Sequence, residues 1–407
     1  MDMTYHAIVV GARCAGAPTA MLLARQGHRV LLLDRATLPS DTISTHVIHA
    51  PGVAALSRWG LLDKVVATGC PPIDTYSYDF GPFTIRGAAR PVGGRSSGYA
   101  PRRTVLDKML LDAATASGVE ARERFNVDSL LVEDGTVVGV VGHAEDGERV
   151  EARARIVIGA DGKNSRVAKA VSAPEYETRP RLQYSYYTYF RDLPTDGMEV
   201  FIRPDRGFAA APTNDGLTMV VVGWPYAESA AYKADVEENF LTTLALAPGF
   251  AERVHAATRT APFLGAAVPG FFRTPFGAGW ALVGDAGYNK DPITAQGISD
   301  AFLDAERCCS AIDAWFRGGS TYDDAMGSWQ QARDTGALPI YEFTSQLATL
   351  EPPPLEMQQL LGAVHGNEEA MDGFVSVVAG TVSPVEFFSP DNIGRITQAA
   401  RRPAVVR

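Results

Sequence analysis

The chain has 407 residues, more than the roughly 250–300 at which a single hydrophobic core usually stops growing, so we expect two lobes that share one cleft. Hydrophobic residues make up 46% and charged residues 21% of the chain, a balance typical of a globular protein. The net charge of −10, without a basic stripe, argues against a nucleic-acid partner, and no apolar run is long enough to cross a bilayer.

The cysteines and the N-terminus narrow the class further. The four cysteines form no metal-binding pattern, so no metal site is predicted. Met1 to Thr4 lead directly into an apolar strand, with neither a basic region nor a cleavable apolar segment before it. We therefore expect a cytoplasmic protein.

The N-terminal stretch predicts a βαβ unit. Tyr5 to Val10 is a short apolar run, a turn with two glycines follows, and residues 17–26 have the apolar spacing of a helix that ends at Gly27. A second apolar run, residues 30–33, ends at the acidic residue Asp34. This order of strand, glycine turn, helix and strand is typical of a dinucleotide-binding unit.

The glycine turn is where a diphosphate is expected. Gly11 allows the tight turn and Gly16 allows close packing of helix and strand, whereas Arg13 occupies the position of the usual second glycine. A guanidinium at that position can pair with phosphate or stack on a cofactor, and the helix N-terminus favours negative charge. Asp34 follows at the end of the second strand, where its carboxylate can accept hydrogen bonds from ribose hydroxyls. The predicted contacts of this turn are Gly11, Arg13, Cys14, Ala15, Gly16, Asp34 and Arg35.

The middle of the chain changes in character. Residues 104–116 have helical spacing, residues 127–141 predict a hairpin, and a buried strand at 154–159 runs into Asp161-Gly162. From about residue 176 to 272, aromatic and β-branched runs alternate with Pro, Asp and Gly turns. This pattern predicts an antiparallel sheet inserted into the first domain.

A second cofactor motif follows the strand at residues 280–283. Asp285 comes at the end of this buried strand, where a carboxylate is costly to desolvate unless it accepts good hydrogen bonds. A polyol such as the ribityl chain of a flavin supplies them. A long helix starts near Thr294, and its N-terminal amides and dipole would stabilise negative charge on the pyrimidine edge of a reduced flavin. The predicted contacts of this segment are Gly284, Asp285, Pro292, Gln296, Gly297 and Ile298.

In these two motifs the chain resembles the flavoprotein aromatic hydroxylase superfamily (p-hydroxybenzoate hydroxylase-like). This superfamily includes aromatic monooxygenases, geranylgeranyl reductases and flavin-dependent halogenases. The third match is the segment 158–165, which contains Asp161-Gly162. The resemblance implies FAD as cofactor and NADPH or NADH as reductant. It also implies cofactor contacts from Asp161, Gly162 and Arg103, the last at the start of a helix that matches the family pattern over residues 103–110.

The resemblance also implies the fold. We expect an α/β protein with a Rossmann-like FAD-binding domain, which contains a GR2-type βαβ unit with a three-stranded crossover, an inserted antiparallel β-sheet substrate domain and a C-terminal helical segment. We assign residues 1–75, 100–175 and 273–345 to the FAD-binding domain and residues 76–99 and 176–272 to the substrate-binding sheet domain. Residues 346–407 are expected to form a C-terminal cap.

Several residues are candidates for the substrate side. His46 and His49 lie where the superfamily brings a loop toward the flavin ring, and each is either an acid–base group near neutral pH or a hydrogen-bonded structural histidine. Aromatic residues on strands can line a cleft or pack the sheet. The predicted pocket wall consists of Tyr187, Tyr189, Phe208, Pro212 and Trp224.

The resemblance implies an FAD-dependent monooxygenase that inserts one oxygen atom from O2, through a C4a-hydroperoxyflavin, into a small or medium apolar or aromatic substrate. Such an enzyme needs a dry cavity and an oriented acceptor rather than a catalytic triad. The nearest alternative is a flavin-dependent reductase of carbon–carbon double bonds of the geranylgeranyl reductase type. A non-catalytic FAD-binding escort protein is a third reading.

Three departures from the family pattern bear on these readings. Ala168 stands where hydroxylases often carry an arginine near the NADPH site, so reducing equivalents could come from NAD(P)H directly or through a partner flavin reductase. Tyr288 replaces a common histidine. Halogenation is a minor reading, because halogenases usually carry a Trp-x-Trp-x-Ile-Pro motif and this chain has only Gly223-Trp224-Pro225.

Overall fold

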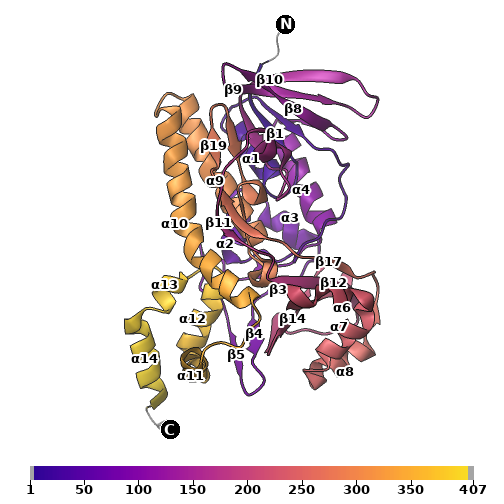
Figure 1. The fold of residues 1–407 in the computed structure, drawn as a ribbon, viewed down its shortest axis with the longest axis vertical. Coiled ribbons are helices and arrows are strands. Elements are labelled where there is room, and N and C mark those ends of the chain that lie inside the picture. The colour runs from indigo at the N-terminus through magenta and orange to yellow at the C-terminus, as the bar shows by residue number, and fades with distance from the viewer. Residues whose placement is uncertain (1–3, 402–407) are drawn as a thin grey trace.

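The computed structural model describes residues 4–401. Three parts can be followed in Figure 1: a part of sheet and helices that carries the N-terminus, a second sheet with its own short helices, and a group of helices that carries the C-terminus. Among the described helices, none is both long and apolar enough to cross a membrane.

The first part is built on a mixed eight-stranded sheet. Its strands are β1 (Thr4–Val10), β2 (Val30–Leu33), β7 (Glu120–Arg122), β8 (Asn126–Glu133), β9 (Thr136–His143), β10 (Arg149–Gly159), β19 (Phe276–Gly277) and β20 (Trp280–Leu282). The order is β19-β20-β10-β1-β2-β7, with β20, β10, β1, β2 and β7 parallel. Because the carboxyl ends of parallel strands meet at one edge, the turns after β1, β2, β10 and β20 come together there.

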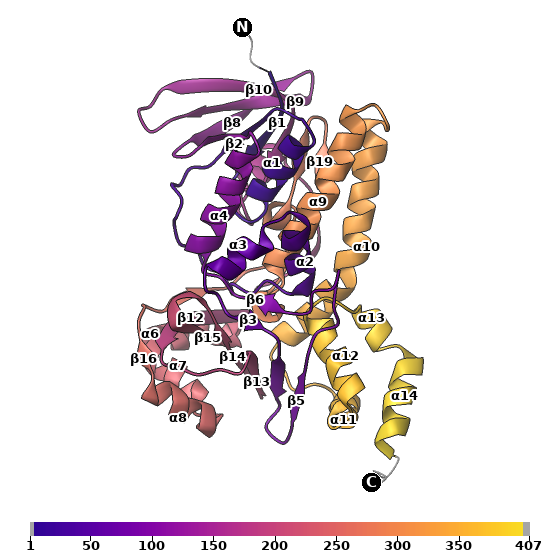
Figure 2. The ribbon, with the colours of Figure 1, turned by 180° about the vertical axis from the view of Figure 1, so that it is seen from behind.

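Helices pack around this sheet, and β8, β9 and the start of β10 extend it as an antiparallel ribbon at the top of Figures 1 and 2. The ribbon contains the predicted hairpin, which turns at Asp134-Gly135 with both residues at positive φ. The helices of this part are α1 (Gly16–Arg25), α2 (Ala50–Arg58), α3 (Leu62–Ala67), α4 (Arg103–Ala116), α5 (Arg166–Ala170), α9 (Gly297–Phe316) and α10 (Tyr322–Ala348).

The second sheet is largely antiparallel. Its strands are β4 (Tyr76–Asp79), β5 (Thr84–Gly87), β12 (Gln183–Arg191), β13 (Met198–Arg203), β14 (Arg206–Pro212), β15 (Leu217–Pro225), β16 (Thr258–Arg259) and β17 (Leu264–Ala266). The order is β16-β12-β15-β14-β13-β4-β5, with β17 beside β12. β4 and β5 thus join strands that lie about a hundred residues further along the chain.

The two faces of this sheet have different neighbours. The helices α6 (Ser229–Ala234), α7 (Val236–Leu244) and α8 (Pro248–Ala256) follow β15 in the chain. Val222 and Trp224 pack in one cluster with Phe240 of α7, whereas Met219 and Val221, the alternate residues of the same strand, belong to a different cluster. One face of the sheet is therefore covered by α7 and α8, and these helices leave the other face uncovered.

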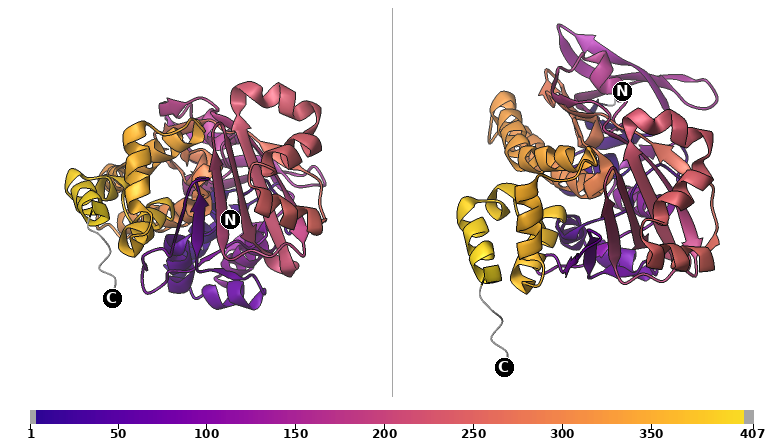
Figure 3. Two further views of the ribbon diagram at one scale, coloured as in Figure 1. Left: turned by 90° about the horizontal axis from the view of Figure 1, so that it is seen from below. Right: turned by 60° about the horizontal axis from the view of Figure 1, so that its bottom comes forward.

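The C-terminal helices lie on the side of the second sheet away from α6, α7 and α8 (Figure 3). They are α11 (Leu355–Val364), α12 (Glu368–Val378), α13 (Pro384–Phe387) and α14 (Pro390–Arg401), and we call residues 346–401 the C-terminal cap. Within the cap, α12 contacts β5 and α13 contacts α10.

Short elements join these parts. They are β3 (Pro72–Ile73) with β6 (Gly98–Tyr99), the three-stranded sheet of β11 (Glu175–Arg179), β18 (Gly270–Arg273) and β21 (Tyr288–Asn289), and the 3₁₀ helices η1 (Asn214–Gly216), η2 (Tyr226–Glu228), η3 (Gly284–Ala286) and η4 (Pro292–Thr294). The fold confirms the predicted α/β class with a sheet-rich cofactor fold and C-terminal helices.

Candidate functional site

A cavity of about 1540 Å³ opens between the three parts. At one end it reaches the turns after β1, β2, β10 and β20, and at the other it runs between the second sheet and the C-terminal cap. Typical small-molecule sites occupy roughly 300–1,000 Å³, so this space is large enough for a cofactor and a second molecule together.

The glycine turn after β1 lines the first end. Gly11 has φ +103°, and a Cβ there would lie 2.4 Å from the carbonyl oxygen of Ala160. A Cβ on Gly16 would lie 1.7 Å from the carbonyl oxygen of Gly11. Asp34 holds the turn from the side, since its Oδ2 accepts a hydrogen bond from the amide of Ala12 at 2.7 Å. The backbone packs so closely that only glycine fits at both positions.

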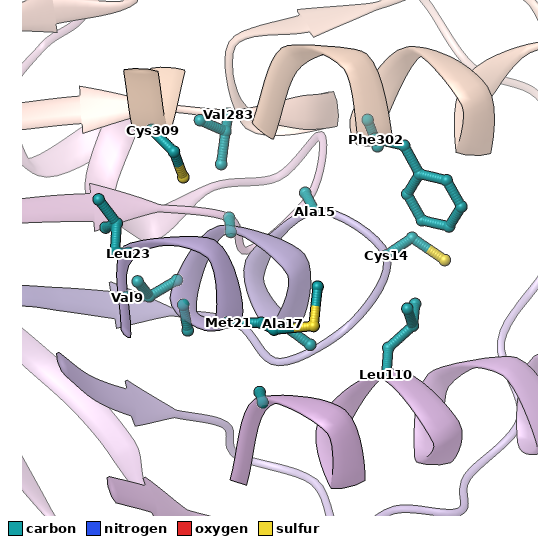
Figure 4. Packing of buried hydrophobic residues seen from close by; sticks show 14 of the residues in the cluster. Val9, Cys14, Ala15, Ala17, Met21, Leu23, Leu110, Val283, Phe302 and Cys309 are labelled. Atoms are coloured by element: carbon teal, nitrogen blue, oxygen red, sulfur yellow. The ribbon is translucent and has the colours of Figure 1, made fainter. Parts of the chain in front are cut away.

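The two cofactor motifs touch each other. A Cβ on Gly284, which has φ +57°, would lie 2.7 Å from the Cβ of Ala15. The Gly284 amide donates to Asp304 Oδ2 at 2.9 Å. Figure 4 shows Ala15 on the side of the turn that faces Val283, within the cluster of small and apolar residues that joins α1 to α9. Segments nearly 270 residues apart in the sequence thus form one continuous surface.

Asp107 holds two arginine side chains in place at this end of the cavity. Its carboxylate is fully buried and accepts hydrogen bonds from Arg13 Nη1 at 2.6 Å and from Arg103 Nε and Nη2 at 3.0 Å each. Cys14 Sγ lies 3.3 Å from the same carboxylate. Arg13 and Arg103 both line the cavity, so two guanidinium groups share one carboxylate and leave a net positive charge for an anionic ligand.

Asp107 was not among the predicted site residues. The signal that could have found it is its spacing from Arg103, because residues four apart on a helix lie on the same face. Arg35 also lines the cavity, with an exposed side chain.

Asp285 faces the cavity without a protein partner. Its side chain is exposed there, and its carboxylate accepts no hydrogen bond from residues 4–401. Because protein surrounds it on the other sides, desolvation raises the pKa of the carboxyl, and Lys163 and Arg103 oppose that rise. These properties suit a ligand that brings hydroxyl donors.

The segment from η4 into α9 lines the cavity beside Asp285. Gly297 and Ile298 line it, and a Cβ on Gly297 would meet open space. Gln296 is turned elsewhere: its Nε2 donates to the Val378 carbonyl of α12 at 2.7 Å, and its Oε1 accepts from Lys290 Nζ at 2.7 Å. The Gln296 side chain therefore ties the start of α9 to the C-terminal cap.

Asp161 and Gly162 line the cavity at the end of β10. Asp161 accepts hydrogen bonds from Ser165 Oγ at 2.5 Å and from the Arg166 amide at 2.6 Å, next to the N-terminus of α5, where Ser165 is the N-cap. These bonds hold the carboxylate in place at the edge of the cavity.

The two histidines lie behind the cavity wall, fully buried. Burial, together with Arg103 and Arg102, lowers the pKa of His46 to about 3, and its Nε2 lies 2.5 Å from the Tyr189 hydroxyl. Burial lowers the pKa of His49 to about 4, and its Nε2 donates to the Thr294 carbonyl at 3.0 Å. Both imidazoles are neutral at physiological pH, and neither lines the cavity.

The predicted wall residues divide between the two faces of the second sheet. Tyr187 lines the cavity, and Tyr189 on the same face is bonded to His46 instead. Phe208 also lines the cavity, and its ring stacks on Phe201 and Phe250 of the cluster beside α8.

Trp224 is placed away from the cavity. Its Nε1 donates to Thr243 of α7 at 2.9 Å, and its ring stacks on Tyr232. Pro212 ends β14 and does not line the cavity. Register explains these positions, since residues an even number apart on a strand share a face.

Small and apolar residues that the sequence analysis did not single out form the wall instead. They come from the uncovered face of the second sheet and from the C-terminal cap with the end of α10. The sheet contributes Tyr78, Met198, Val200, Ala209, Ala211 and Val221, and the helices contribute Phe343, Leu347, Leu361, Phe374, Val378 and Phe388. The sequence signal that could have predicted these wall residues is the alternation of side chains between the two faces of β14 and β15.

Comparison with known proteins identifies the cofactor. A family model described as an FAD binding domain matches residues 4–334, more than half of the chain. The chain belongs to this FAD-binding family. It is an FAD-dependent oxidoreductase of a family that uses NAD(P)H as reductant.

Individual relatives carry different activities. Digeranylgeranylglycerophospholipid reductase 2 of Methanopyrus kandleri is 28% identical over 321 residues, 74% of this chain and 75% of that protein. Rifampicin monooxygenase of Streptomyces venezuelae is 26% identical over 389 residues, 88% of this chain and 74% of that protein. The structure of the myxobacterial chondrochloren halogenase has a TM-score of 0.77 at 24% identity and covers 98% of this chain and 96% of that chain. The last likeness shows the fold.

Proposed function

We propose that this protein is an FAD-dependent monooxygenase that inserts one oxygen atom from O2 into an apolar organic substrate. The observation that carries the proposal is that a single cavity joins the glycine turns to a wall of apolar side chains. A substrate held against that wall lies beside the cofactor with little water, which oxygen-transfer chemistry on a flavin requires. Bound FAD supplies the redox chemistry, and the protein supplies binding, orientation and a dry cavity.

The cofactor end fits FAD by shape and by charge. The glycines at positions 11 and 284 let the two turns pack closely against Ala160 and Ala15, which brings both turns to the same end of the cavity. Arg13 and Arg103 are assigned to the diphosphate, and Asp285 to the ribityl hydroxyls. The N-terminus of α9 is assigned to the pyrimidine edge of the flavin ring.

Asp34 is assigned to the ribose. Its two oxygens accept hydrogen bonds from the amides of Ala12 and Ala36, which hold the carboxylate in place at the edge of the cavity. A carboxylate oxygen accepts more than one hydrogen bond, so ribose hydroxyls can add to these.

Reduction of a carbon–carbon double bond is the second candidate. It is favoured by the curated relatives, most of which are named digeranylgeranylglycerophospholipid reductases. The same apolar wall suits a long isoprenoid chain. The monooxygenase proposal draws support from rifampicin monooxygenase, which matches 88% of this chain.

One experiment separates the two candidates. FAD-loaded protein is incubated with NADPH or NADH under oxygen-18 gas, with and without an added flavin reductase, and with acceptors that include a phenol, rifampicin and a geranylgeranylated glycerophospholipid. Mass spectrometry of the products is the measurement. A product with one oxygen-18 atom supports the monooxygenase, whereas a product that has gained two hydrogens and no label, formed equally well without O2, replaces it with the reductase.

A further inference from the structure

Asp291 lies at the junction of the cofactor end and the substrate end of the cavity. It directly precedes Pro292, caps η4 and lines the cavity. Its Oδ1 accepts hydrogen bonds from the Gln183 side chain of β12 and from the Ile293 amide, the latter at 3.0 Å. The carboxyl therefore connects the flavin-side loop to the strand that also carries Tyr187.

The second oxygen of this carboxyl has no partner. Asp291 Oδ2 is buried, and no described residue donates a hydrogen bond to it. A buried anionic oxygen without a donor is costly, and the cost disappears when that oxygen carries a proton. Burial without a donor therefore favours the form of Asp291 in which Oδ2 carries a proton.

Within residues 4–401, no charged side chain offsets this effect. Lys290 is the neighbouring residue, but its ammonium is paired with Asp300 Oδ2 of α9 at 2.7 Å and with Gln296 Oε1. From α10, Thr344 faces the same loop through Thr294, and from β12 the facing group is the neutral amide of Gln183. Burial accordingly raises the pKa of Asp291 to about 7, against the smaller opposing effect of its two hydrogen bonds.

The histidines predicted for acid–base work are unsuited to it. His46 and His49 have pKa values lowered by burial, and they lie outside the cavity wall. A proton exchanger works best when its pKa lies near the working pH and when it reaches the reacting atoms. Of these three candidates, Asp291 alone lines the cavity.

We propose that Asp291 is the proton-exchanging residue of this site. Both candidate reactions consume one proton for each NAD(P)H oxidised. Because Oδ2 is shielded from solvent in the described structure, a local movement of the carboxyl must first bring it to the cavity. The Oδ2–H bond then breaks and its proton passes to the reacting atoms: to the oxygen that leaves as water in oxygenation, or to substrate carbon in double-bond reduction. The carboxylate then takes a proton from solvent. The assignment rests on the proposed function only for the identity of the proton acceptor.

The first test needs no substrate. Infrared spectra of FAD-loaded protein are recorded between pH 5 and 9, and the carbonyl stretch of a protonated carboxyl is followed. We expect a band that titrates near pH 7 and that is missing in Asp291→Asn, a variant of the same shape. The loss of a donor to the charged form should move the titration to higher pH in Gln183→Leu. His49→Gln, which keeps a donor toward the Thr294 carbonyl, should retain the band unchanged.

The second test uses the acceptor identified by the labelling experiment. Turnover of the wild-type protein should fall as pH rises through about 7, because the protonated carboxyl is the donor, and Asp291→Asn should lose about a hundredfold in rate together with that pH dependence. FAD content, read from the visible spectrum, should match the wild type. A titrating band that survives in Asp291→Asn, or a pH limb that His49→Gln removes, overturns the proposal. Since the infrared titration is independent of substrate, its outcome stands whichever reaction the labelling experiment reveals.

Discussion

The two ends of the cavity are built on different principles. At the cofactor end, Gly11 and Gly16 pack against backbone and Gly284 against the Ala15 side chain so tightly that none has room for a Cβ, and Asp107 holds Arg13 and Arg103 in place. At the substrate end, side chains such as Ala209 and Leu361 form a smooth apolar wall. The first end depends on backbone geometry and tolerates little change. The second depends on side-chain volume, and we expect it to tolerate substitution better.

Two side-chain hydrogen bonds join these ends beside the flavin site. Asp291 joins η4 to Gln183 of the second sheet, and Gln296 joins the start of α9 to Val378 of the C-terminal cap. These bonds hold the loop next to the flavin site from both sides. Substitutions at either end, and at the boundary, test whether the two ends are independent.

The largest effect is expected at the cofactor end. Gly16→Ala would place a Cβ 1.7 Å from the Gly11 carbonyl oxygen, which neither backbone segment can avoid without opening the turn. We expect protein without bound FAD, as measured by the visible spectrum after purification. Gly327→Ala is the control, since its Cβ would meet open space in α10 and alanine favours the helix. Retention of stoichiometric FAD in Gly16→Ala would contradict the described turn.

The second-largest effect is expected from removing the buried negative charge of Asp107 at the cofactor end. Asp107→Asn leaves the buried guanidinium of Arg103 without its carboxylate, and breaking such a buried pair costs about 3–5 kcal/mol. The loss should be greatest in FAD-free protein, because the diphosphate supplies the missing negative charge. Thermal unfolding with and without FAD is the measurement. Asp112→Asn, which breaks an exposed pair on the same helix, should change the free energy of unfolding by less than about 1 kcal/mol in both states.

A smaller and pH-dependent effect is expected at the boundary. Because the pKa of Asp291 is raised to about 7 in the folded protein, the folded state binds more protons than the unfolded state between about pH 4 and 7. Stability is therefore lost as pH rises through that window, by about 1.4 kcal/mol for each pKa unit of difference. Asp291→Asn removes this loss, so its melting temperature relative to wild type should increase from pH 5 to pH 8. A difference that is constant with pH would mean that the carboxyl does not titrate in this range.

The smallest effect on stability is expected at the substrate end. Ala209→Phe adds a ring on the cavity face of β14, where it occupies space rather than displacing core atoms. FAD content and melting temperature should stay close to wild type, whereas turnover of a large acceptor should fall at least about tenfold. Steady-state kinetics with a small and a large acceptor check this expectation. Equal losses for both acceptors, or loss of FAD, would show that the two ends are coupled.

Much of the cofactor end was predictable from sequence. The spacing of Gly11, Gly16 and Asp34 and the pair Gly284-Asp285 predicted that two distant segments serve one cofactor, and the structure brings them into contact. Such motifs are readable because close backbone approach permits only glycine, whatever the rest of the chain does. Asp107 escaped notice, because its significance arises only when Arg13 and Arg103 converge on it from two elements.

The substrate end was decided by tertiary structure. Trp224 is a suitable wall residue by type, yet strand register turns it toward α7, where its Nε1 donates to Thr243. His46 and His49 are suitable acid–base groups by type, yet burial keeps them neutral. The sequence by itself determined the FAD-binding framework, because backbone geometry leaves a local signature. Tertiary structure decided which side chains meet the substrate and which carboxyl holds a proton, because face, burial and partners depend on elements far apart in the chain.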